Sequence, residues 1–257
     1  MDIGYNHTMS VLCDVTGVDD PLVVRRDGPL AWLIFNRPGA GNAMDAAMMA
    51  ALPEVWAQLD ADDGVRVIVV TGAGRAFQTG LDMVQLAREP GALLEMSRRT
   101  KRADPRLTGW HCGVSKPIVT AVNGVCAGAG LHFVADSDVV VASCRATFLD
   151  PHVSVGQASV FEAIGLARRA AFGPVARMAL TGAGERVSAQ RAFELGWVSQ
   201  VVDPDERLPE VAAKLAMRIA RNDPAALAAT KQALWSALES GLSATRRRCS
   251  LTNQEQR

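Results

Sequence analysis

Residues 116–132 read KPIVTAVNGVCAGAGLH and combine an apolar run, a turn signal and a glycine-rich segment. The β-branched run 118–122 lies between a proline and the Asn-Gly pair 123–124, a pattern that predicts a buried strand ending in a turn. We expect a helix to follow at once, opened by the small residues 128–130. The first N–H groups of a helix have no intrahelical partner, so this segment is suited to hold an anionic group.

The glycine spacing in this stretch, G-V-C-A-G-A-G, leaves two roles open. It matches neither the GxGxxG pattern of dinucleotide-binding loops nor the GxxxxGK[ST] phosphate loop, because no Lys-Ser/Thr pair follows Gly130. Small residues at such a turn also serve close packing of a strand against a helix, without any ligand. Nucleotide binding of these two kinds is therefore disfavoured, and an anion site and a packing role stay as alternatives.

The composition is that of an ordinary globular protein with one hydrophobic core. The chain has 257 residues, of which 49% are hydrophobic and 21% charged, enough to bury a full core in one domain. The formal net charge is zero and the isoelectric point is about 6.9, so no overall field attracts nucleic acid or an anionic membrane. Neither is expected as a partner.

Neither a secretion signal nor a membrane span is predicted. Residues 1–20 lack a basic start and a sustained apolar core, and no later apolar run reaches membrane-spanning length. We interpret residues 1–20 as a flexible N-terminal extension. The five cysteines are odd in number and have no CxxC spacing, which favours reduced thiols and a cytoplasmic location over disulfides or a zinc site.

Strand and helix signals alternate along the chain and predict an α/β fold. The runs 22–25 and 30–35 flank Asp27-Gly28, a strong hairpin signal. Asp45 is expected to cap a helix that Pro53 interrupts or kinks. Further strands are expected at 65–71, 118–122, 137–142 and 198–202. After residue 156 the pattern is otherwise helical, with helices expected at 157–171, 174–181, 188–195, 207–221 and 224–238, the last capped by Asp223.

Two basic segments have no assigned role from their pattern alone. Residues 88–108 include five basic side chains, namely Arg98, Arg99, Lys101, Arg102 and Arg106. This segment is interpreted either as a solvated helix and loop or as a surface that faces a phosphate. Residues 246–248 are three consecutive arginines and are most simply an exposed tail.

Three stretches together resemble the crotonase family, that is, enoyl-CoA hydratases and isomerases. They are NRPGAGNAM (36–44), GAGRAFQTGLDM (72–83) and AVNGVCAGAG (121–130). Order and spacing also agree farther along, where TFLDPHVSVG (147–156) stands at the family's Pro-Glu loop and FGPVARMALTG (172–182) at a helix that leads to a Thr-Gly turn. The likeness covers about residues 22–240.

The resemblance implies a crotonase-like spiral of ββα units over residues 21–195. It also implies a helical C-terminal region over residues 196–257 that joins the chain into a homotrimer or a hexamer. The implied substrate is an acyl-CoA thioester. Coenzyme A is then part of the substrate, and no separate cofactor and no metal are expected.

The resemblance further implies an oxyanion hole. In the family two backbone N–H groups hold the thioester oxygen, and the matching positions here are Leu81 and Ala129. Catalysis at a thioester builds negative charge on that oxygen, which fixed N–H donors and a helix N-terminus stabilise. The positions that match substrate or coenzyme A contacts are Arg37, Ala40, Gly80, Asp82, Gly128 and Lys231, the last reaching from a neighbouring subunit.

The acid/base positions depart from the family's pattern. Hydratases place one Glu in the helix after the glycine-rich segment and a second after the proline of the later loop, where this chain has His132 and His152. One buried histidine is often structural, but two at both positions favour a catalytic pair, one ring as base toward water and the other as proton donor. Asp150 is placed to orient an imidazole. Asp82 and Glu162 are nearby candidates in the family's layout, but the simpler interpretation is that Asp82 is a turn residue and Glu162 a helix-face residue.

Three functions follow from these residues as hypotheses. The first is hydration of a 2,3-enoyl-CoA thioester through an oxyanion-stabilised enolate. The second is hydrolytic carbon–carbon cleavage of a β-dicarbonyl compound, of the retro-Claisen type, since related hydrolases of the crotonase fold use histidine. The third is acyl-CoA binding without turnover. Only the first two predict a product whose formation depends on the protein.

Overall fold

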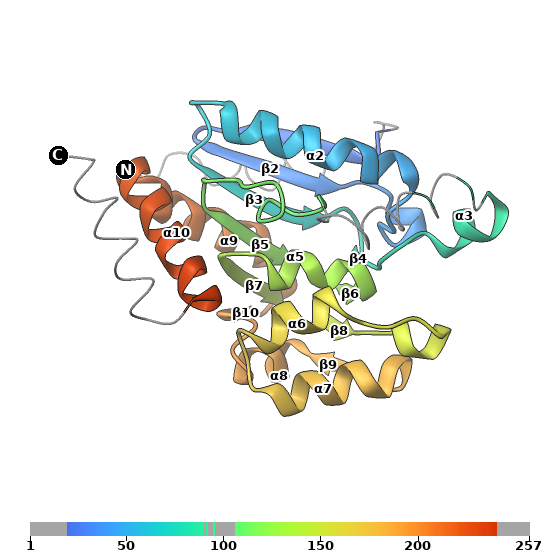
Figure 1. Ribbon diagram of the computed structural model, residues 1–257. Coiled ribbons are helices and arrows are strands. Elements are labelled where there is room, and N and C mark those ends of the chain that lie inside the picture. The colour runs from blue at the N-terminus through green and yellow to red at the C-terminus, as the bar shows by residue number, and fades with distance from the viewer. Residues whose placement is uncertain (1–19, 90, 92–94, 96–105, 241–257) are drawn as a thin grey trace.

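Two β-sheets and the helices around them make up the described part of the chain (Figure 1). The structure, a computed structural model, describes residues 20–89, 91, 95 and 106–240. The larger sheet has six strands and the smaller sheet has four. Strands and helices alternate along the chain, which confirms the predicted α/β class.

The larger sheet begins with a hairpin and continues in parallel. The hairpin pairs β1 (Leu22–Asp27) with β2 (Leu30–Phe35), as the turn signal between them predicts. The strands that follow are β3 (Val67–Gly72), β5 (Ile118–Val122), β7 (Val139–Ser143) and β10 (Gln200–Val202), in the order β2-β3-β5-β7-β10. Each overlaps its predicted range. Strands β2, β3 and β5 are buried along their whole length, so their sequences are continuous apolar runs that are easy to recognise.

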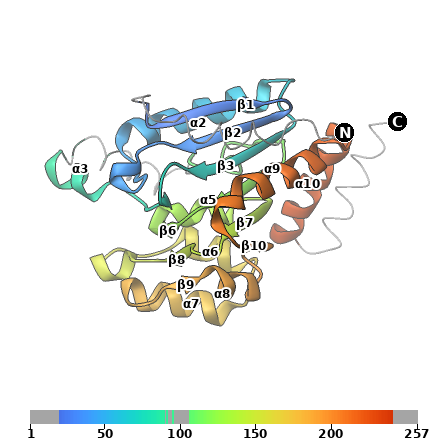
Figure 2. The same ribbon diagram turned by 180° about the vertical axis from the view of Figure 1, so that it is seen from behind.

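Helices α2 (Ala46–Ala61) and α9 (Leu208–Ala220) cover opposite faces of the larger sheet. Alternate side chains of β2 point to the two sides, so that Leu33 belongs to the same core as α2 and Trp32 to the same core as α9. Figure 2 shows α9 lying across the sheet, with α10 (Pro224–Glu239) beside it. The sheet is therefore a rigid central layer for the loops at its ends.

The interruption expected at Pro53 does not occur. α2 is one helix of 16 residues that continues past the proline. A proline inside a helix costs about 3 kcal/mol through a lost hydrogen bond and a ring clash. Here Leu52, Trp56 and Leu59 are buried in the core, and burial of each such side chain contributes about 2 kcal/mol, which outweighs the cost.

Four short strands that the sequence patterns missed form the smaller sheet. They are β4 (Ala76–Gln78), β6 (Val125–Ala127), β8 (Thr147–Leu149) and β9 (Val187–Ser188). The first three pair in parallel, and β9 pairs antiparallel with β8. The expectation that the chain after residue 156 holds no strand besides the one near 198–202 is therefore wrong. Runs of two or three residues carry too little periodicity to predict a strand.

The helix expected directly after the Asn-Gly pair 123–124 begins later. Strand β6 comes first, and the 3₁₀ turn η2 (Gly128–Leu131) and the single-turn helix α5 (His132–Ala135) follow it. The strand forms because β4 and β8 pair with its two edges and because Cys126 is fully buried. The glycine-rich segment thus joins a strand to a helix through a tight turn.

The helices of the C-terminal part agree with the predictions except at one position. They are α6 (Phe161–Ala167), α7 (Phe172–Thr181), α8 (Ala189–Glu194), α9 and α10. α6 is much shorter than the predicted helix over 157–171. Gly156, with a left-handed φ of +72°, ends the 3₁₀ turn η3 (His152–Val155). Residues 157–160 then belong to no helix, and residues 168 and 169 form a turn after Ala167.

Two predicted caps are confirmed. The Asp45 side chain accepts the Met48 N–H at 2.8 Å at the start of α2. The Asp223 side chain accepts the Ala226 N–H at 2.8 Å at the start of α10. Each carboxylate satisfies an N–H group that has no partner inside the helix.

Several predictions fall outside the described residues or are not tested by them. Residues 1–19 of the predicted extension, most of the basic segment 88–108 and the arginines 246–248 lie outside. The domain boundaries at 20 and 195 stay predictions. Among the described helices, none has the length and apolar run that a membrane crossing requires. The three described cysteines, Cys112, Cys126 and Cys144, take part in no disulfide among the described residues, and the reduced state stays a prediction.

Candidate active site

A cavity of about 260 Å³ lies where η2, α5, the loop of η3 and the start of α6 meet. Four of the predicted site residues line it, namely Leu81, Ala129, His132 and His152. The other lining residues are Met49, Leu107, Gln157, Ala158, Val160, Phe161 and Glu162. The fold therefore brings both predicted histidines and both predicted oxyanion-hole residues to one place.

The turn that carries Leu81 is fixed by hydrogen bonds on both sides. Gly80 has φ +94°, and its N–H donates to Oε1 of Gln78 at 2.7 Å. The Gly80 carbonyl accepts the N–H of Met44 at 2.8 Å, while the Asp82 N–H donates to the Met44 carbonyl at 2.9 Å. Within the described residues, the N–H of Leu81 itself has no hydrogen-bond acceptor. It is a fixed donor at the wall of the cavity.

The turn that carries Ala129 packs directly against the first one. A Cβ on Gly80 would lie 3.4 Å from the Ala129 nitrogen, and a Cβ on Gly130 would lie 2.3 Å from the carbonyl oxygen of Gln78. Glycine is therefore required at position 130. Gly128 has φ +52°, which other residues rarely adopt. No carbonyl of the described residues accepts the Ala129 N–H, as expected near the start of a helical turn.

His152 and Asp150 form a close pair next to Gly128, where a Cβ would lie 3.7 Å from Cε1 of His152. Nδ1 of His152 lies 2.6 Å from Oδ1 of Asp150, a fully buried carboxylate. Asp150 also accepts the backbone N–H of His152 at 3.3 Å and the hydroxyl of Ser159. A carboxylate at Nδ1 keeps the proton on that nitrogen, which leaves Nε2 of the neutral ring as a proton acceptor. The predicted orienting role of Asp150 agrees with this geometry.

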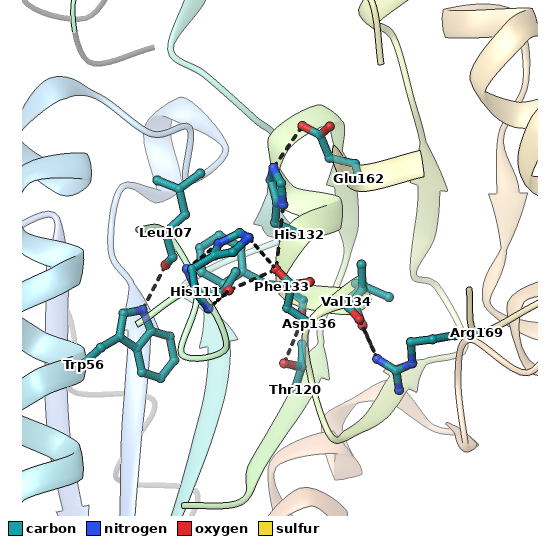
Figure 3. A network of polar contacts seen from close by, with 12 residues as sticks. Trp56, Leu107, His111, Thr120, His132, Phe133, Val134, Asp136, Glu162 and Arg169 are labelled. Carbon is teal, nitrogen blue, oxygen red and sulfur yellow. Dashed lines mark hydrogen bonds and ion pairs between the residues drawn. The ribbon is translucent and has the colours of Figure 1, made fainter. Parts of the chain in front are cut away.

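His132 is held by contacts around the single-turn helix α5 (Figure 3). The hydroxyl of Thr120 donates to the carbonyl of Phe133 at 3.0 Å. The guanidinium of Arg169 donates to the carbonyls of Val134 and Ala135 at 3.1 Å and 2.8 Å. A four-residue helix has little stability of its own, so these donors to its carbonyl groups fix its position.

The His132 ring lies between two carboxylates. Its Nε2 is 3.3 Å from Oε1 of Glu162, and its Nδ1 is 3.8 Å from Oδ2 of Asp136. Burial by itself lowers the pKa of His132, but hydrogen bonds and charges from Asp136 and Glu162 outweigh burial and raise this pKa to about 9. The ring is therefore an imidazolium near neutral pH and suits the role of proton donor.

From the sequence, Glu162 is interpreted as a residue on a helix face. The structure places it in the lining of the cavity. It lies in the first turn of α6 and is only 6% exposed. Burial raises its pKa, but the hydrogen bond and charge of His132 outweigh burial and lower this pKa to about 2. The family's layout makes Glu162 a nearby candidate, but no sequence pattern predicts its contact with both histidines, because His132, His152 and Glu162 come from three separate segments.

A second polar group lies behind His132, away from the 260 Å³ cavity. Nε2 of His111 is 3.4 Å from Oδ2 of Asp136, and the Thr108 hydroxyl donates to the same oxygen at 2.9 Å. Among the described residues, His111, His132 and Asp136 form a group whose ligand atoms lie within 4.8 Å of one another, so these three side chains have metal-ligand spacing. A metal is not needed to satisfy these ligand atoms, because hydrogen bonds and a proton on His132 also satisfy them.

Arg37 and Asp82, predicted to contact the ligand, bind each other. Nη2 of Arg37 lies 2.8 Å from Oδ2 of Asp82, and its Nε lies 3.1 Å from Oδ2 of Asp45. Asp82 also caps α3 (Met83–Arg88) by accepting the N–H groups of Val84 and Gln85. Burial raises the pKa of Asp82, but these N–H groups and Arg37 lower it below its ordinary value. The turn-residue interpretation of Asp82 is confirmed.

The remaining predicted contacts lie apart from the cavity. Ala40 is exposed in the 3₁₀ turn η1 (Pro38–Ala40). The Lys231 amine donates to the carbonyl of Lys116 at 2.8 Å and lies 3.0 Å from Oδ2 of Asp138. Lys231 lines a different cavity of about 620 Å³, between α10 and the turn over 110–115. The predicted contact of Lys231 concerns a neighbouring subunit and stays a prediction.

The fold and the motifs agree with one known family. The family model described as enoyl-CoA hydratase/isomerase matches residues 26–256. The chain belongs to the enoyl-CoA hydratase/isomerase family.

Curated members of the family resemble the chain over most of its length. It is 35% identical over 215 residues to (E)-benzylidenesuccinyl-CoA hydratase of Thauera aromatica, covering 83% of this chain and 81% of that protein. It is 34% identical over 206 residues to 1,2-epoxyphenylacetyl-CoA isomerase of Escherichia coli (strain K12), covering 80% of this chain and 78% of that protein. The proteins that resemble the chain thus include both a hydratase and an isomerase.

A solved structure of the family has the same fold. The crystal structure of an enoyl-CoA hydratase/isomerase from Mycobacterium paratuberculosis superposes with a TM-score of 0.81 at 36% identity, covering 92% of this chain and 89% of that chain. The predicted crotonase-like fold and the resemblance to enoyl-CoA hydratases and isomerases are confirmed. The chain is accordingly an enzyme of this family.

Proposed function

We propose that the chain adds water across the 2,3-double bond of an enoyl-CoA thioester, with His152 as base and His132 as proton donor. The observation that carries this proposal is that two unpaired amides and two imidazoles line one cavity of about 260 Å³. The names of similar proteins support a coenzyme A thioester as substrate. Coenzyme A then belongs to the substrate, and no separate cofactor takes part.

The amides of Leu81 and Ala129 are assigned to the thioester oxygen. Attack of water at C3 moves the electron pair of the double bond toward the carbonyl, so negative charge develops on that oxygen. The turn before Leu81 and the turn before Ala129 are fixed by hydrogen bonds and close packing, so both donors need little reorganisation. Removal of one such donor typically costs about 10²-fold in rate or more.

The two histidines divide the proton transfers. His152, with Nδ1 held by Asp150, accepts a proton from water at Nε2. His132, kept protonated by Glu162 and Asp136, gives its Nε2 proton to C2 as the enolate collapses. A neutral ring and a charged ring thus do the work that two carboxyl groups do in the family's hydratases.

Coenzyme A is assigned to the outer surface of the loop over 36–42. Pro38, Gly39 and Ala40 are exposed there, and Arg37 and Asp82 brace the loop from behind. Gly80 and Gly128 are assigned to contacts near the thioester, because they precede the two amides. Lys231 of a neighbouring subunit in a trimer or hexamer would complete the phosphate site only after it leaves Asp138.

Carbon–carbon hydrolysis is a second candidate, favoured by the Asp150–His152 pair. An imidazole whose Nδ1 is held by a buried carboxylate is suited to activate water toward a carbonyl carbon. In that reaction, attack of water on one carbonyl of a β-dicarbonyl compound breaks the adjacent carbon–carbon bond. The leaving enolate would again need the amides of Leu81 and Ala129.

Mass analysis of a panel of enoyl-CoA and β-keto-CoA thioesters tests these proposals. Hydration adds the mass of one water to an enoyl thioester, whereas carbon–carbon hydrolysis adds one water and splits the molecule in two. Calorimetry with the same thioesters measures binding separately. Tight binding without any product would contradict both reactions and support an acyl-CoA binding protein, and no binding at millimolar ligand would contradict the thioester assignment itself.

A further inference from the structure

Glu162 lies between the two imidazoles of the proposed acid/base pair. Its Oε1 is 3.3 Å from Nε2 of His132 and 3.7 Å from Nε2 of His152. The carboxylate is almost fully buried at the cavity wall. Within the described residues its ion pairs are with these two histidines and with no lysine or arginine.

The orientation of both rings makes this carboxylate oxygen the shared neighbour of their Nε2 atoms. Asp150 holds Nδ1 of His152 at 2.6 Å, and Asp136 lies on the Nδ1 side of His132 at 3.8 Å. Both Nε2 atoms therefore face Glu162. The 3.3 Å contact is near hydrogen-bond distance, and the 3.7 Å contact reaches it after a shift of a few tenths of an ångström.

We propose that Glu162 returns the proton from His152 to His132 after each turnover, an inference that rests on the proposed function. Its geometric basis is one buried carboxylate oxygen within 4 Å of both Nε2 atoms.

The proton balance of hydration requires such a return. As the water oxygen bonds to C3, His152 Nε2 takes one proton from that water, and the electron pair of the double bond moves into the enolate. The enolate then forms a C2–H bond with the Nε2 proton of His132. The product holds all atoms of water, but His152 now carries an extra proton and His132 lacks one. Glu162 Oε1 accepts the proton from His152 and donates it to His132, which restores both rings.

The titratable and charged groups that face the two rings come from several neighbouring elements. α5 and the residue after it supply His132 and Asp136, the segment before β5 supplies His111, and the loop of η3 supplies His152 and Asp150. Arg168, Arg169 and Glu239 line a cavity of about 140 Å³ on the far side of His132. None of these groups forms an ion pair within 4 Å of both Nε2 atoms; among the described residues, Glu162 alone does.

The test compares the wild-type chain with Glu162→Gln, which keeps the size of the side chain and removes its ability to carry a proton. Single-turnover and steady-state rates of thioester hydration are measured at pH 6 with increasing imidazole buffer. We expect the ratio of single-turnover rate to kcat to rise about 10-fold or more in Glu162→Gln, and its kcat to recover with buffer. Glu194→Gln, at an exposed carboxylate of α8, is the matched control and should behave as wild type.

A second measurement needs no turnover. NMR titration of the imidazole resonances should show the pKa of His132 falling by more than one unit in Glu162→Gln, because the ring loses its closer anion. An unchanged pKa would overturn the proposal even in an active enzyme, and so would a kcat of the variant that buffer does not change. If the wild type hydrates no enoyl thioester, the proposed function fails together with the relay, while the titration still shows whether Glu162 is the shared anion.

Discussion

The unfolding free energy of the chain is expected to depend on pH, because His132 carries a charge that the pH controls. Its pKa is about 9 in the folded chain, against an ordinary value of 6.5. Because the folded-state value is the higher one, the folded state binds the proton more tightly. The stabilisation is fully present below pH 6.5, decreases as the pH rises, and is lost above pH 9.

The magnitude follows from the two pKa values. The difference of about 2.5 corresponds to about 3 kcal/mol of unfolding free energy. The lowered pKa of Glu162 describes the same ion pair, so its contribution is not added. About 3 kcal/mol is a large part of the stability of a typical domain.

The assay is urea unfolding of the wild type and of His132→Gln between pH 6 and pH 10. Protein concentration is held constant, because assembly would shift the apparent stability. Subtracting the unfolding free energy of His132→Gln from that of the wild type removes the contribution of the other titrating groups. We expect the difference in unfolding free energy between the two proteins to be largest at pH 6 and to shrink by about 3 kcal/mol by pH 10. A difference that stays constant over this range would refute the assignment of a charged, buried His132.

Three further predictions follow from the site and the fold. Asp150→Asn keeps the shape of the residue but removes the charge beside His152, and kcat should fall on the order of 10²-fold or more; calorimetry should show unchanged thioester affinity, and a wild-type kcat would count against the His152 base. Gly130→Ala places a Cβ 2.3 Å from the Gln78 carbonyl oxygen and should lower the unfolding free energy by about 1–3 kcal/mol. Gly173→Ala, where nothing lies within 4 Å, is its control, and equal stability of the two variants would contradict the close packing of the two turns. Light scattering should give a homotrimer or hexamer, and a monomer at micromolar concentration would refute this assembly.

The elements that sequence predicted are those whose signal is local. The hairpin of β1 and β2 is marked by Asp27-Gly28 between two apolar runs, and the caps Asp45 and Asp223 stand directly before their helices. β5 is a run of five buried residues between a proline and an Asn-Gly pair. Such patterns depend on neighbours in sequence, so they remain readable without tertiary information.

The elements that sequence missed depend on contacts between distant segments. β6 has only three residues and exists because β4 and β8 pair with it. α2 continues through Pro53 because buried side chains hold it to the sheet. Tertiary packing stabilises α2 although local propensity opposes a helix at Pro53, and it stabilises β6 although three residues give no local signal.

The candidate site shows the same division. Asp150 and His152 are two residues apart, so their pairing could be expected from sequence. Glu162 meets His132 only because α6 packs near α5, and its position in a helical pattern favoured the helix-face interpretation. His111 lies in a segment without a recognisable motif, and its contact with Asp136 depends entirely on the fold.

The two-histidine mechanism is tested most directly by the kcat of His132→Ala and of His152→Ala on an enoyl-CoA thioester that the wild type converts, with thioester affinity measured alongside. We expect each variant to lose on the order of 10²-fold or more in kcat while binding survives. Recovery of hydration in the double variant His132→Glu, His152→Glu would show that the scaffold is a hydratase whose acid/base pair has been exchanged. Near-native rates in both alanine variants would contradict the two-histidine mechanism.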